Sequence, residues 1–228
     1  MNGKHVIMAI MAHPDDAELR CFGTLCKYQD MGYSCINLIV CNGENGVSLA
    51  DKERTGIDTI PKLVRFNESQ ESFKDTQIEL ATLGFSDSSI TVGRELIIAI
   101  EEKIRQYKPE IIITHYPDEF CADHQDHYNV GRATINCATR SVNVKKILLC
   151  EPQMAIRSKF VPNCYVNITP YFDKKAKALS YHKSQAGRFY LDKKYHEIKS
   201  LYYAASVGFS SAKNDERYEA FYILHCVE

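Results

Sequence analysis

Short apolar runs alternate along this chain with longer segments whose apolar residues recur at helical spacing. The apolar runs predict strands at 6–12, 35–41, 78–83, 110–114 and 147–150, with a final strand at 221–225. Helical spacing predicts helices around 19–28, 62–74, 96–104 and 130–138, and two more after Thr169-Pro170, where the threonine is expected to be the N-cap. Strands that alternate with helices predict an α/β fold, with a mostly parallel sheet and helices on both of its faces.

The order of these elements also predicts where a functional site lies. Ligands of such sheets bind beyond the carboxyl ends of the strands, at the point where the strand order reverses. We therefore expect any chemistry in the residues that follow the first, second and fourth predicted strands. No linker or repeat divides the 228 residues, which favours a single domain over residues 1–228, with a helical segment at about 169–228 packed on it.

Composition and charge narrow the classes of function. The 28 basic and 29 acidic residues leave a net charge of -1, which argues against binding of nucleic acid or anionic membrane through bulk charge. No apolar run reaches the roughly 18 residues of a membrane-spanning helix, and the first residues lack the pattern of a signal peptide. Nine cysteines without CxxC pairs predict reduced, mostly buried thiols in a cytoplasmic protein.

Two clusters of histidine and aspartate follow the first and fourth predicted strands. The first includes His13, Asp15 and Asp16, and the second extends from His115 to His127. If a helix begins near Asp15, His13 and Asp16 can fold back onto a common point while Asp15 faces elsewhere. A third ligand from the second cluster, His127 or its rival His115, would complete a site with two histidines and one carboxylate. That ligand set leaves one zinc position open to water, as in catalytic sites.

The other groups of these clusters have roles in a metal-assisted hydrolysis. Asp15, close to the metal but not bound to it, is expected to take a proton from water as the general base. His124 would lie on the same side of the metal as His127, where it can polarise a substrate carbonyl or protonate a leaving amine. Asp126 or Asp123 would fix the tautomer of His124. The predicted reaction is hydrolysis of an amide or ester.

Each cluster also has a purely structural interpretation. Asp15 and Asp16 are suitable as the N-cap and a first-turn acid of a helix, and His115 as a core histidine at the end of a strand. The stretch 118–127 is compatible with a solvated, charge-rich loop. The joint placement of both clusters at strand ends, with matching ligand types, favours the metal site over these interpretations.

Two motifs in these clusters resemble those of a known family. They are His13-Pro14-Asp15-Asp16-x-Glu18-Leu19 and His124-x-Asp126-His127, and they resemble the PIG-L (LmbE-like) zinc-dependent N-acetyl-sugar deacetylases, with Gln125 where the family usually has proline. Weaker similarities cover most of the chain, at Gly43-Glu44, Arg65-x-x-Glu68, 83–87, His182-x-Ser184-Gln185 and 218–221.

The resemblance implies a Rossmann-like fold and hydrolytic removal of an N-acetyl (N-acyl) group from an amino sugar or amino-sugar conjugate. It implies one Zn2+ per chain held by His13, Asp16 and His127, although Fe2+ and Co2+ suit the same ligand types. It assigns Asp15 as the general base, and His124 as the residue that stabilises the oxyanion or acts as the acid. It also implies substrate contacts by three further residues, Arg65, Asp87 and Glu44.

Two departures from the family pattern affect these expectations. Arg20 and Phe22 stand where the family has glycines, so the local backbone or pocket is expected to differ. Arg20 itself is expected on the surface or, alternatively, at an anionic group of the substrate. Ala122 and Asp123 replace a tyrosine or arginine that often precedes the second motif. The alternative function is therefore a non-catalytic sugar- or nucleotide-binding member of the same fold.

The expected partner is a small amino-sugar substrate, with no nucleic acid and no integral membrane association. A dinucleotide-dependent enzyme is disfavoured, because no GxGxxG follows the first strand and carboxylates stand where a pyrophosphate needs bare amides. The sequence leaves a homo-oligomer open.

Overall fold

The computed structural model describes residues 5–118, 124–153, 155–208 and 215–227. Within these residues, strands form one sheet in the order β3-β2-β1-β4-β5-β7-β6. The strands are Val6–Met11 (β1), Ser34–Cys41 (β2), Glu79–Phe85 (β3), Ile111–His115 (β4), Lys146–Cys150 (β5), Cys164–Asn167 (β6) and Tyr218–Cys226 (β7). Strands β1 to β5 are parallel, and β7 is antiparallel to its neighbours β5 and β6. The predicted mostly parallel sheet is confirmed.

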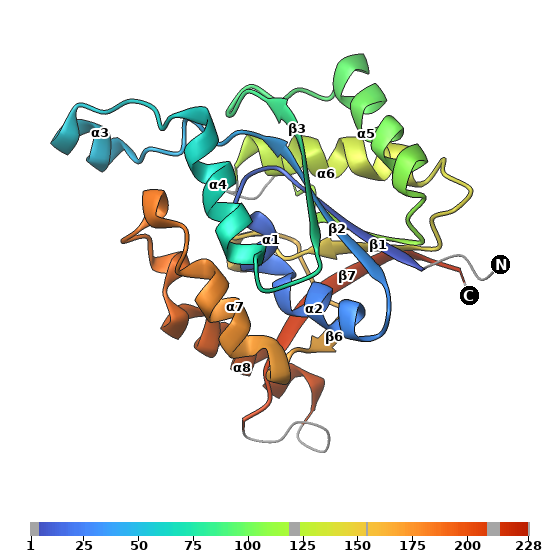
Figure 1. Cartoon of the computed structure of the whole chain (residues 1–228). Coiled ribbons are helices and arrows are strands. Elements are labelled where there is room, and N and C mark those ends of the chain that lie inside the picture. The colour runs from blue at the N-terminus through green and yellow to red at the C-terminus, as the bar shows by residue number, and fades with distance from the viewer. Residues whose placement is uncertain (1–4, 119–123, 154, 209–214, 228) are drawn as a thin grey trace.

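Helices cover both faces of this sheet (Figure 1). Helices α5 (Arg94–Tyr107) and α6 (Gln125–Ala138) pack on the face that β1 presents through Met8 and Ile10. The opposite face packs against α1 (Asp16–Arg20), α2 (Phe22–Asp30), α4 (Lys62–Phe73) and α7 (Phe172–Leu179). Helix α8 (Lys193–Val207) lies against β7, whereas α3 (Leu49–Thr55) protrudes from the body and has no buried residue. Short 3-10 helices occupy Ala155–Arg157, Thr169–Tyr171, Lys183–Gln185 and Phe189–Leu191.

The apolar runs explain the central strands, because β1 and β4 are buried on both faces by the two helix layers. The short strand β6 and the helix α3 were not predicted, since the first has only half-buried residues and the second has no apolar stripe. The predicted helix over 19–28 is interrupted at Cys21, which separates α1 from α2. Thr169 is not an N-cap: its hydroxyl accepts a hydrogen bond from the backbone N–H of Arg217 instead. No helix of the described residues has both the length and the apolar character to cross a bilayer.

The order of the strands in the sheet determines where the functional site is expected. The chain proceeds outward from β1 to β2 and β3, and then crosses to β4 on the other side of β1, so the order reverses between β1 and β4. Helix α6 approaches the end of β4 closely at Gly131, where a Cβ atom would lie 2.5 Å from the backbone oxygen of His115. This contact holds α6 against the end of β4, the neighbour of β1, and His127 in the first turn of α6 reaches His13 after β1.

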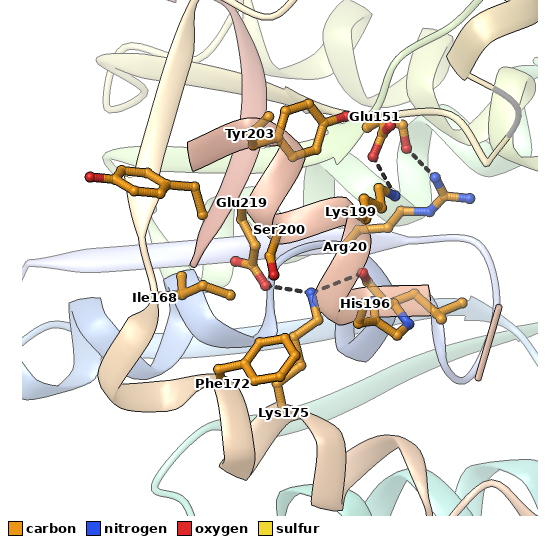
Figure 2. Close-up of a pocket in the computed structure, with 13 residues that line it drawn as sticks. Arg20, Glu151, Ile168, Phe172, Lys175, His196, Lys199, Ser200, Tyr203 and Glu219 are labelled. Atoms are coloured by element: carbon orange, nitrogen blue, oxygen red, sulfur yellow. Dashed lines mark hydrogen bonds and ion pairs between the residues drawn. The ribbon is translucent and has the colours of Figure 1, made fainter. Parts of the chain in front are cut away.

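A buried polar cluster supports α1 from the C-terminal part of the chain (Figure 2). Lys175 Nζ donates to Glu219 Oε1 at 2.7 Å and to the carbonyl oxygen of Leu19 at 3.0 Å. Glu219 also accepts from the backbone N–H groups of Gly23 and Thr24, at the start of α2. These bonds satisfy the backbone groups exposed by the break between the two helices, and they fix the segment that carries Asp16.

His196 in the same cluster is expected to make stability depend on pH. Burial, together with the positive charges of Lys175 and Lys199, lowers the pKa of His196 to about 2. The unfolded chain binds a proton at this histidine near pH 6.5 and the folded chain does not, so the free energy of unfolding falls as the pH drops below 6.5. Urea unfolding of wild type and His196→Gln at pH 7 and pH 5 measures this contribution, which is up to about 1.4 kcal/mol per pH unit. An equal pH dependence in both proteins would contradict it.

Candidate active site

His13, Asp16 and His127 converge beyond the carboxyl ends of β1 and β4, and all three are buried. His13 Nδ1 lies 3.0 Å from His127 Nε2 and 3.4 Å from Asp16 Oδ2, and His127 Nε2 lies 3.2 Å from Asp16 Oδ1. Tetrahedral zinc with bonds of about 2.0–2.1 Å keeps its ligand atoms about 3.3 Å apart. The spacing of these two nitrogen atoms from each other and from the oxygens of the Asp16 carboxylate therefore fits a zinc ion, and the residue types fit its ligand chemistry.

A tight turn after β1 separates the two aspartates. Asp15 has φ 107° and ψ -24°, a left-handed conformation that is costly for a residue with a side chain. Asp16 begins α1, and its Oδ2 accepts the backbone N–H of His13 at 2.8 Å. Asp16 therefore folds back toward His13, while the Asp15 carboxylate points to Arg65, as the spacing of the motif predicted. Asp15 occupies the N-cap position of α1, but its side chain makes no capping hydrogen bond.

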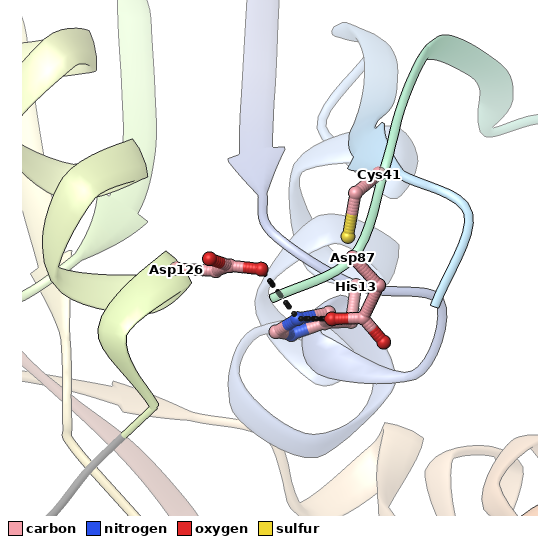
Figure 3. Close-up of side chains that lie close together, drawn as sticks. All are labelled: His13, Cys41, Asp87 and Asp126. Carbon is pink, nitrogen blue, oxygen red and sulfur yellow. Dashed lines mark hydrogen bonds and ion pairs between the residues drawn. The ribbon is translucent and has the colours of Figure 1, made fainter. Parts of the chain in front are cut away.

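Two carboxylates, those of Asp87 and Asp126, lie beside the ring of His13 (Figure 3). His13 Nε2 lies 3.1 Å from Asp87 Oδ1 and 3.5 Å from Asp126 Oδ2, and Cys41 lies close by. Because Nε2 faces carboxylates, it carries the proton, which leaves the lone pair of Nδ1 for a metal. The hydrogen bond to His13 holds the pKa of Asp87 below its usual range, although burial alone would raise it. We interpret Asp87 and Asp126 as the groups that set the tautomer of His13.

His115 is the rival third ligand, and its geometry is different. Its Nε2 accepts the backbone N–H of Ala12 at 2.9 Å, which occupies a lone pair that a metal would need. The ring of His115 stacks on that of His127, with ring centroids 4.3 Å apart. The structure thus brings His127 into the ligand group and places His115 behind it.

Asp15 and Arg65 form a buried ion pair on the wall of the site. Arg65 Nη2 donates to Asp15 Oδ2 at 2.9 Å and to the carbonyl of Pro14 at 2.7 Å, and Nη1 donates to the carbonyl of Gly43 at 3.0 Å. Burial raises the pKa of the Asp15 carboxyl above its usual range, and the charge of Arg65 opposes this only in part. His13, Asp16 and His127 are called the triad below. A carboxylate with a raised pKa that is held near this triad has the properties of a general base.

His124 is the N-cap of α6, and a backbone group fixes its ring. Its Nδ1 accepts the backbone N–H of Asp126 at 3.2 Å, so the proton of the neutral ring is on Nε2. The Asp126 carboxylate is 3.8 Å from Nδ1 and accepts instead from the backbone of Ser88 and Ile90. Burial lowers the pKa of His124, and so does a positive charge on His13 or His127 when either ring is protonated, so His124 stays neutral. The alternative partner, Asp123, is outside the described residues.

A cavity of about 510 Å³ opens onto the triad. Its wall includes Asp15, Arg65, Asp87 and His124, the loop Asn45–Ser48, and a C-terminal stretch with Gln185, Arg188, Phe189 and Tyr190. Glu44 is not part of this wall; its carboxylate accepts the backbone N–H of Asp87 from behind, at 3.3 Å. Sequence reasoning missed Arg188, Phe189 and Tyr190, and the only nearby signal was the His182-x-Ser184-Gln185 similarity.

Arg20 and Phe22, the two departures from the family pattern, both lie away from the cavity wall. The expectation of a surface position for Arg20 is wrong, because this residue is buried. Its guanidinium donates to the backbone oxygen of Glu151 and lies 3.4 Å from His127 Nδ1. Phe22 packs against Phe73 in the core, with ring centroids 5.1 Å apart.

These features define a class: a Rossmann-like α/β protein in which two histidines and one carboxylate that could hold a metal face a cavity, with a further buried carboxylate beside them. The chain belongs to the PIG-L family, because the family's sequence model, described as GlcNAc-PI de-N-acetylase, matches residues 8–138. This is a family of deacetylases.

Individual proteins show the same relationship. The chain is 29% identical over 192 residues to a probable N-acetyl-alpha-D-glucosaminyl L-malate deacetylase 2 of Bacillus cereus, covering 80% of this chain and 84% of the relative. The structure is similar to the N,N'-diacetylchitobiose deacetylase of Pyrococcus horikoshii, with TM-score 0.75, 21% identity, and coverage of 96% and 84% of the two chains. It is also similar to GalB, the 4-carboxy-2-hydroxymuconate hydratase of Pseudomonas putida KT2440, with TM-score 0.81, 17% identity and 98% coverage of both chains. At these identities the two solved structures show the fold alone.

Proposed function

We propose that this protein is a zinc-dependent N-deacetylase that hydrolyses the N-acetyl group of an amino sugar or amino-sugar conjugate. The observation that carries the proposal is the convergence of His13, Asp16 and His127 on the cavity, with the buried carboxylate of Asp15 beside them. Amide hydrolysis near neutral pH requires activation of both the water and the carbonyl group. A metal ion and a general base, placed side by side, meet that requirement.

His13, Asp16 and His127 would hold the metal through Nδ1, the carboxylate and Nε2. When bound, zinc lowers the pKa of its water to about 7 and polarises the acetyl carbonyl. The ligand atoms also suit Fe2+ or Co2+. Zinc, one ion per chain, is the choice that the family resemblance and the spacing of the ligand atoms support.

Asp15 is the proposed general base. It takes the proton of the attacking water as the oxygen bonds to the acetyl carbon, and its raised pKa suits it to accept that proton. Arg65 keeps the carboxylate in place throughout, because both side chains are buried and joined by a 2.9 Å ion pair. The carbon–nitrogen bond then breaks, and the proton leaves with the amine, which yields acetate and a free amino sugar.

His124 is proposed to stabilise the negative charge that develops on the acetyl oxygen. Its Nδ1 accepts the backbone N–H of Asp126, so the proton of the neutral ring is on Nε2, the atom that would donate a hydrogen bond to the acetyl oxygen. Asp126 thus contributes to catalysis through the position and tautomer of His124. A preorganised donor of this kind acts mainly on the transition state, where the oxygen carries most charge.

The proposed substrate is a small amino-sugar derivative, in line with the substrates named for the Bacillus cereus relative and for the Pyrococcus horikoshii enzyme. Contacts of Arg65 and Asp87 with sugar hydroxyls remain part of the proposal, since both side chains line the cavity. Glu44 would act indirectly, through the backbone of Asp87. We also propose a cytoplasmic location for the protein. Assembly into a homo-oligomer remains a prediction.

Two measurements, made one after the other, test this function. Metal-stripped protein is titrated with zinc by calorimetry near neutral pH, and we expect saturation at about one ion per chain, as for a single site. The zinc-loaded protein is then given N-acetylglucosamine and its glycosides, and released primary amine is measured against metal-stripped protein as the control. Absence of saturable zinc binding would contradict the triad. Zinc binding without release of amine from any substrate would favour the non-catalytic alternative.

A further inference from the structure

The buried side chain of Arg20 touches two members of the triad. Its Nε lies 3.6 Å from Asp16 Oδ1, and its Nη2 lies 3.4 Å from His127 Nδ1. Nη1 donates to the backbone oxygen of Glu151, which holds the guanidinium in place (Figure 2). Arg20 does not line the cavity, so its charge reaches the metal site through the ligands and not through the substrate.

The first of these contacts concerns the charge of Asp16. This carboxylate is the one acidic member of the triad, and it is the group that would offset part of the charge of a divalent ion. The guanidinium of Arg20 attracts the same carboxylate from 3.6 Å. A metal ion and Arg20 therefore compete for one negative charge, and the two cations also repel each other.

The second contact concerns the tautomer of His127. If Nε2 of this ring binds the metal, its proton is on Nδ1, and this N–H lies 3.4 Å from a guanidinium nitrogen that also carries only donors. Ligating histidines usually direct that N–H to an acceptor. The other tautomer suits Arg20 better, because Nδ1 then accepts from the guanidinium while Nε2–H faces Asp16 Oδ1 at 3.2 Å. Arg20 thus favours the metal-free pairing of His127 with Asp16.

Other contacts already hold both ligands in position. Asp16 Oδ2 accepts the backbone N–H of His13 at 2.8 Å. His127 lies in the first turn of α6, and its ring stacks on that of His115. Orientation of the ligands therefore does not depend on Arg20, and the main effect of this residue on the site is electrostatic.

We propose that Arg20 lowers the affinity of the triad for zinc, so that the protein exchanges its metal readily and its activity follows the supply of zinc. This inference rests on the proposed function, because it concerns the metal site that the function requires. It adds a control on that site which acts through one buried charge.

The test compares zinc affinities of wild type, Arg20→Gln and Arg20→Lys, measured in competition with a chromogenic chelator. Glutamine is neutral and can still donate to the backbone oxygen of Glu151. We expect Arg20→Gln to bind zinc about 10- to 100-fold more tightly, the range over which outer neighbours of a ligand change metal affinity, and to release it more slowly. Arg20→Lys keeps the charge and should stay close to wild type. Arg54→Gln removes an exposed charge from α3 and should change nothing.

Urea unfolding of the metal-free proteins shows whether each variant is folded. If Arg20→Gln does not fold, a crystal structure of zinc-bound wild type gives the test, with Arg20 Nη2 expected farther than 3.4 Å from His127 Nδ1. A guanidinium within hydrogen-bond distance of Nδ1 in that structure would overturn the proposal.

Unchanged or weaker zinc binding by folded Arg20→Gln would also overturn the proposal, as would an equal gain of affinity in Arg20→Lys. Absence of zinc binding in both wild type and Arg20→Gln would overturn the metal site together with this inference. If the affinities differ as expected but wild type deacetylates no N-acetyl glycoside, the role of Arg20 stands and the proposed function fails.

Discussion

Replacement of Asp15 by asparagine is expected to lower turnover of an N-acetyl amino sugar by at least about 100-fold, the lower end of what a general base contributes. Asparagine has nearly the same shape and can still accept the hydrogen bond of Arg65, but it cannot take a proton from water. Asp15 lies outside the ligand group of His13, Asp16 and His127. Zinc affinity and stoichiometry should therefore remain those of wild type.

The measurement pairs steady-state kinetics with zinc titration on the same preparations. Asp173→Asn is a matched control, because it removes a carboxylate from an exposed pair with Lys193 and should leave both readouts unchanged. Near wild-type turnover in Asp15→Asn would exclude Asp15 as the base. Loss of zinc together with turnover would instead assign Asp15 to the metal.

The site residues that could be predicted from the sequence are those whose position follows from the order of the strands alone. His13 and Asp16 follow β1 directly, and His127 is in the first turn of α6, just beyond the end of β4. In a parallel sheet, the carboxyl ends of adjacent strands lie side by side, and this does not depend on the side chains in the rest of the chain. Local spacing was therefore sufficient to predict that Asp15 and Asp16 point in different directions and that His13, Asp16 and His127 lie together.

The parts that could not be predicted depend on contacts between distant segments. Arg188 and Tyr190 reach the cavity because the C-terminal stretch packs back over the loop at Gly46, and no local pattern encodes that contact. Arg20 would be expected on a helix surface by its type, but α8 and Glu151 bury it. The choice between His127 and His115 depended on a single hydrogen bond from the backbone of Ala12.

Fold and site carry different information about function. GalB, a hydratase by name, shares this fold at a TM-score of 0.81, and a deacetylase shares it at 0.75. The arrangement of strands is thus compatible with more than one reaction. What bears on hydrolysis is the site itself. His13, Asp16 and His127 bring together atoms that can hold a metal, and a buried aspartate paired with Arg65 lies beside them.

Replacement of His127 by glutamine is expected to lower zinc affinity by more than about 100-fold, since loss of a ligand exceeds the 10- to 100-fold cost of losing an outer partner. Turnover should fall with it. His115→Gln is the matched variant, because both histidines are buried, stacked on each other and close to Asp16. His115 Nε2 accepts the backbone N–H of Ala12 and lies outside the group of His13, Asp16 and His127, so this substitution should cost about tenfold at most, as for an outer partner.

Calorimetric zinc titration of both metal-stripped variants decides between the two histidines, and urea unfolding shows that each variant is folded. The opposite order of affinities, with His115→Gln losing zinc and His127→Gln retaining it, would make His115 the third ligand. That result would require the ring of His115 to release the N–H of Ala12, a buried backbone donor that would then need another acceptor. The cost of leaving such a donor unsatisfied, about 1–3 kcal/mol, favours His127.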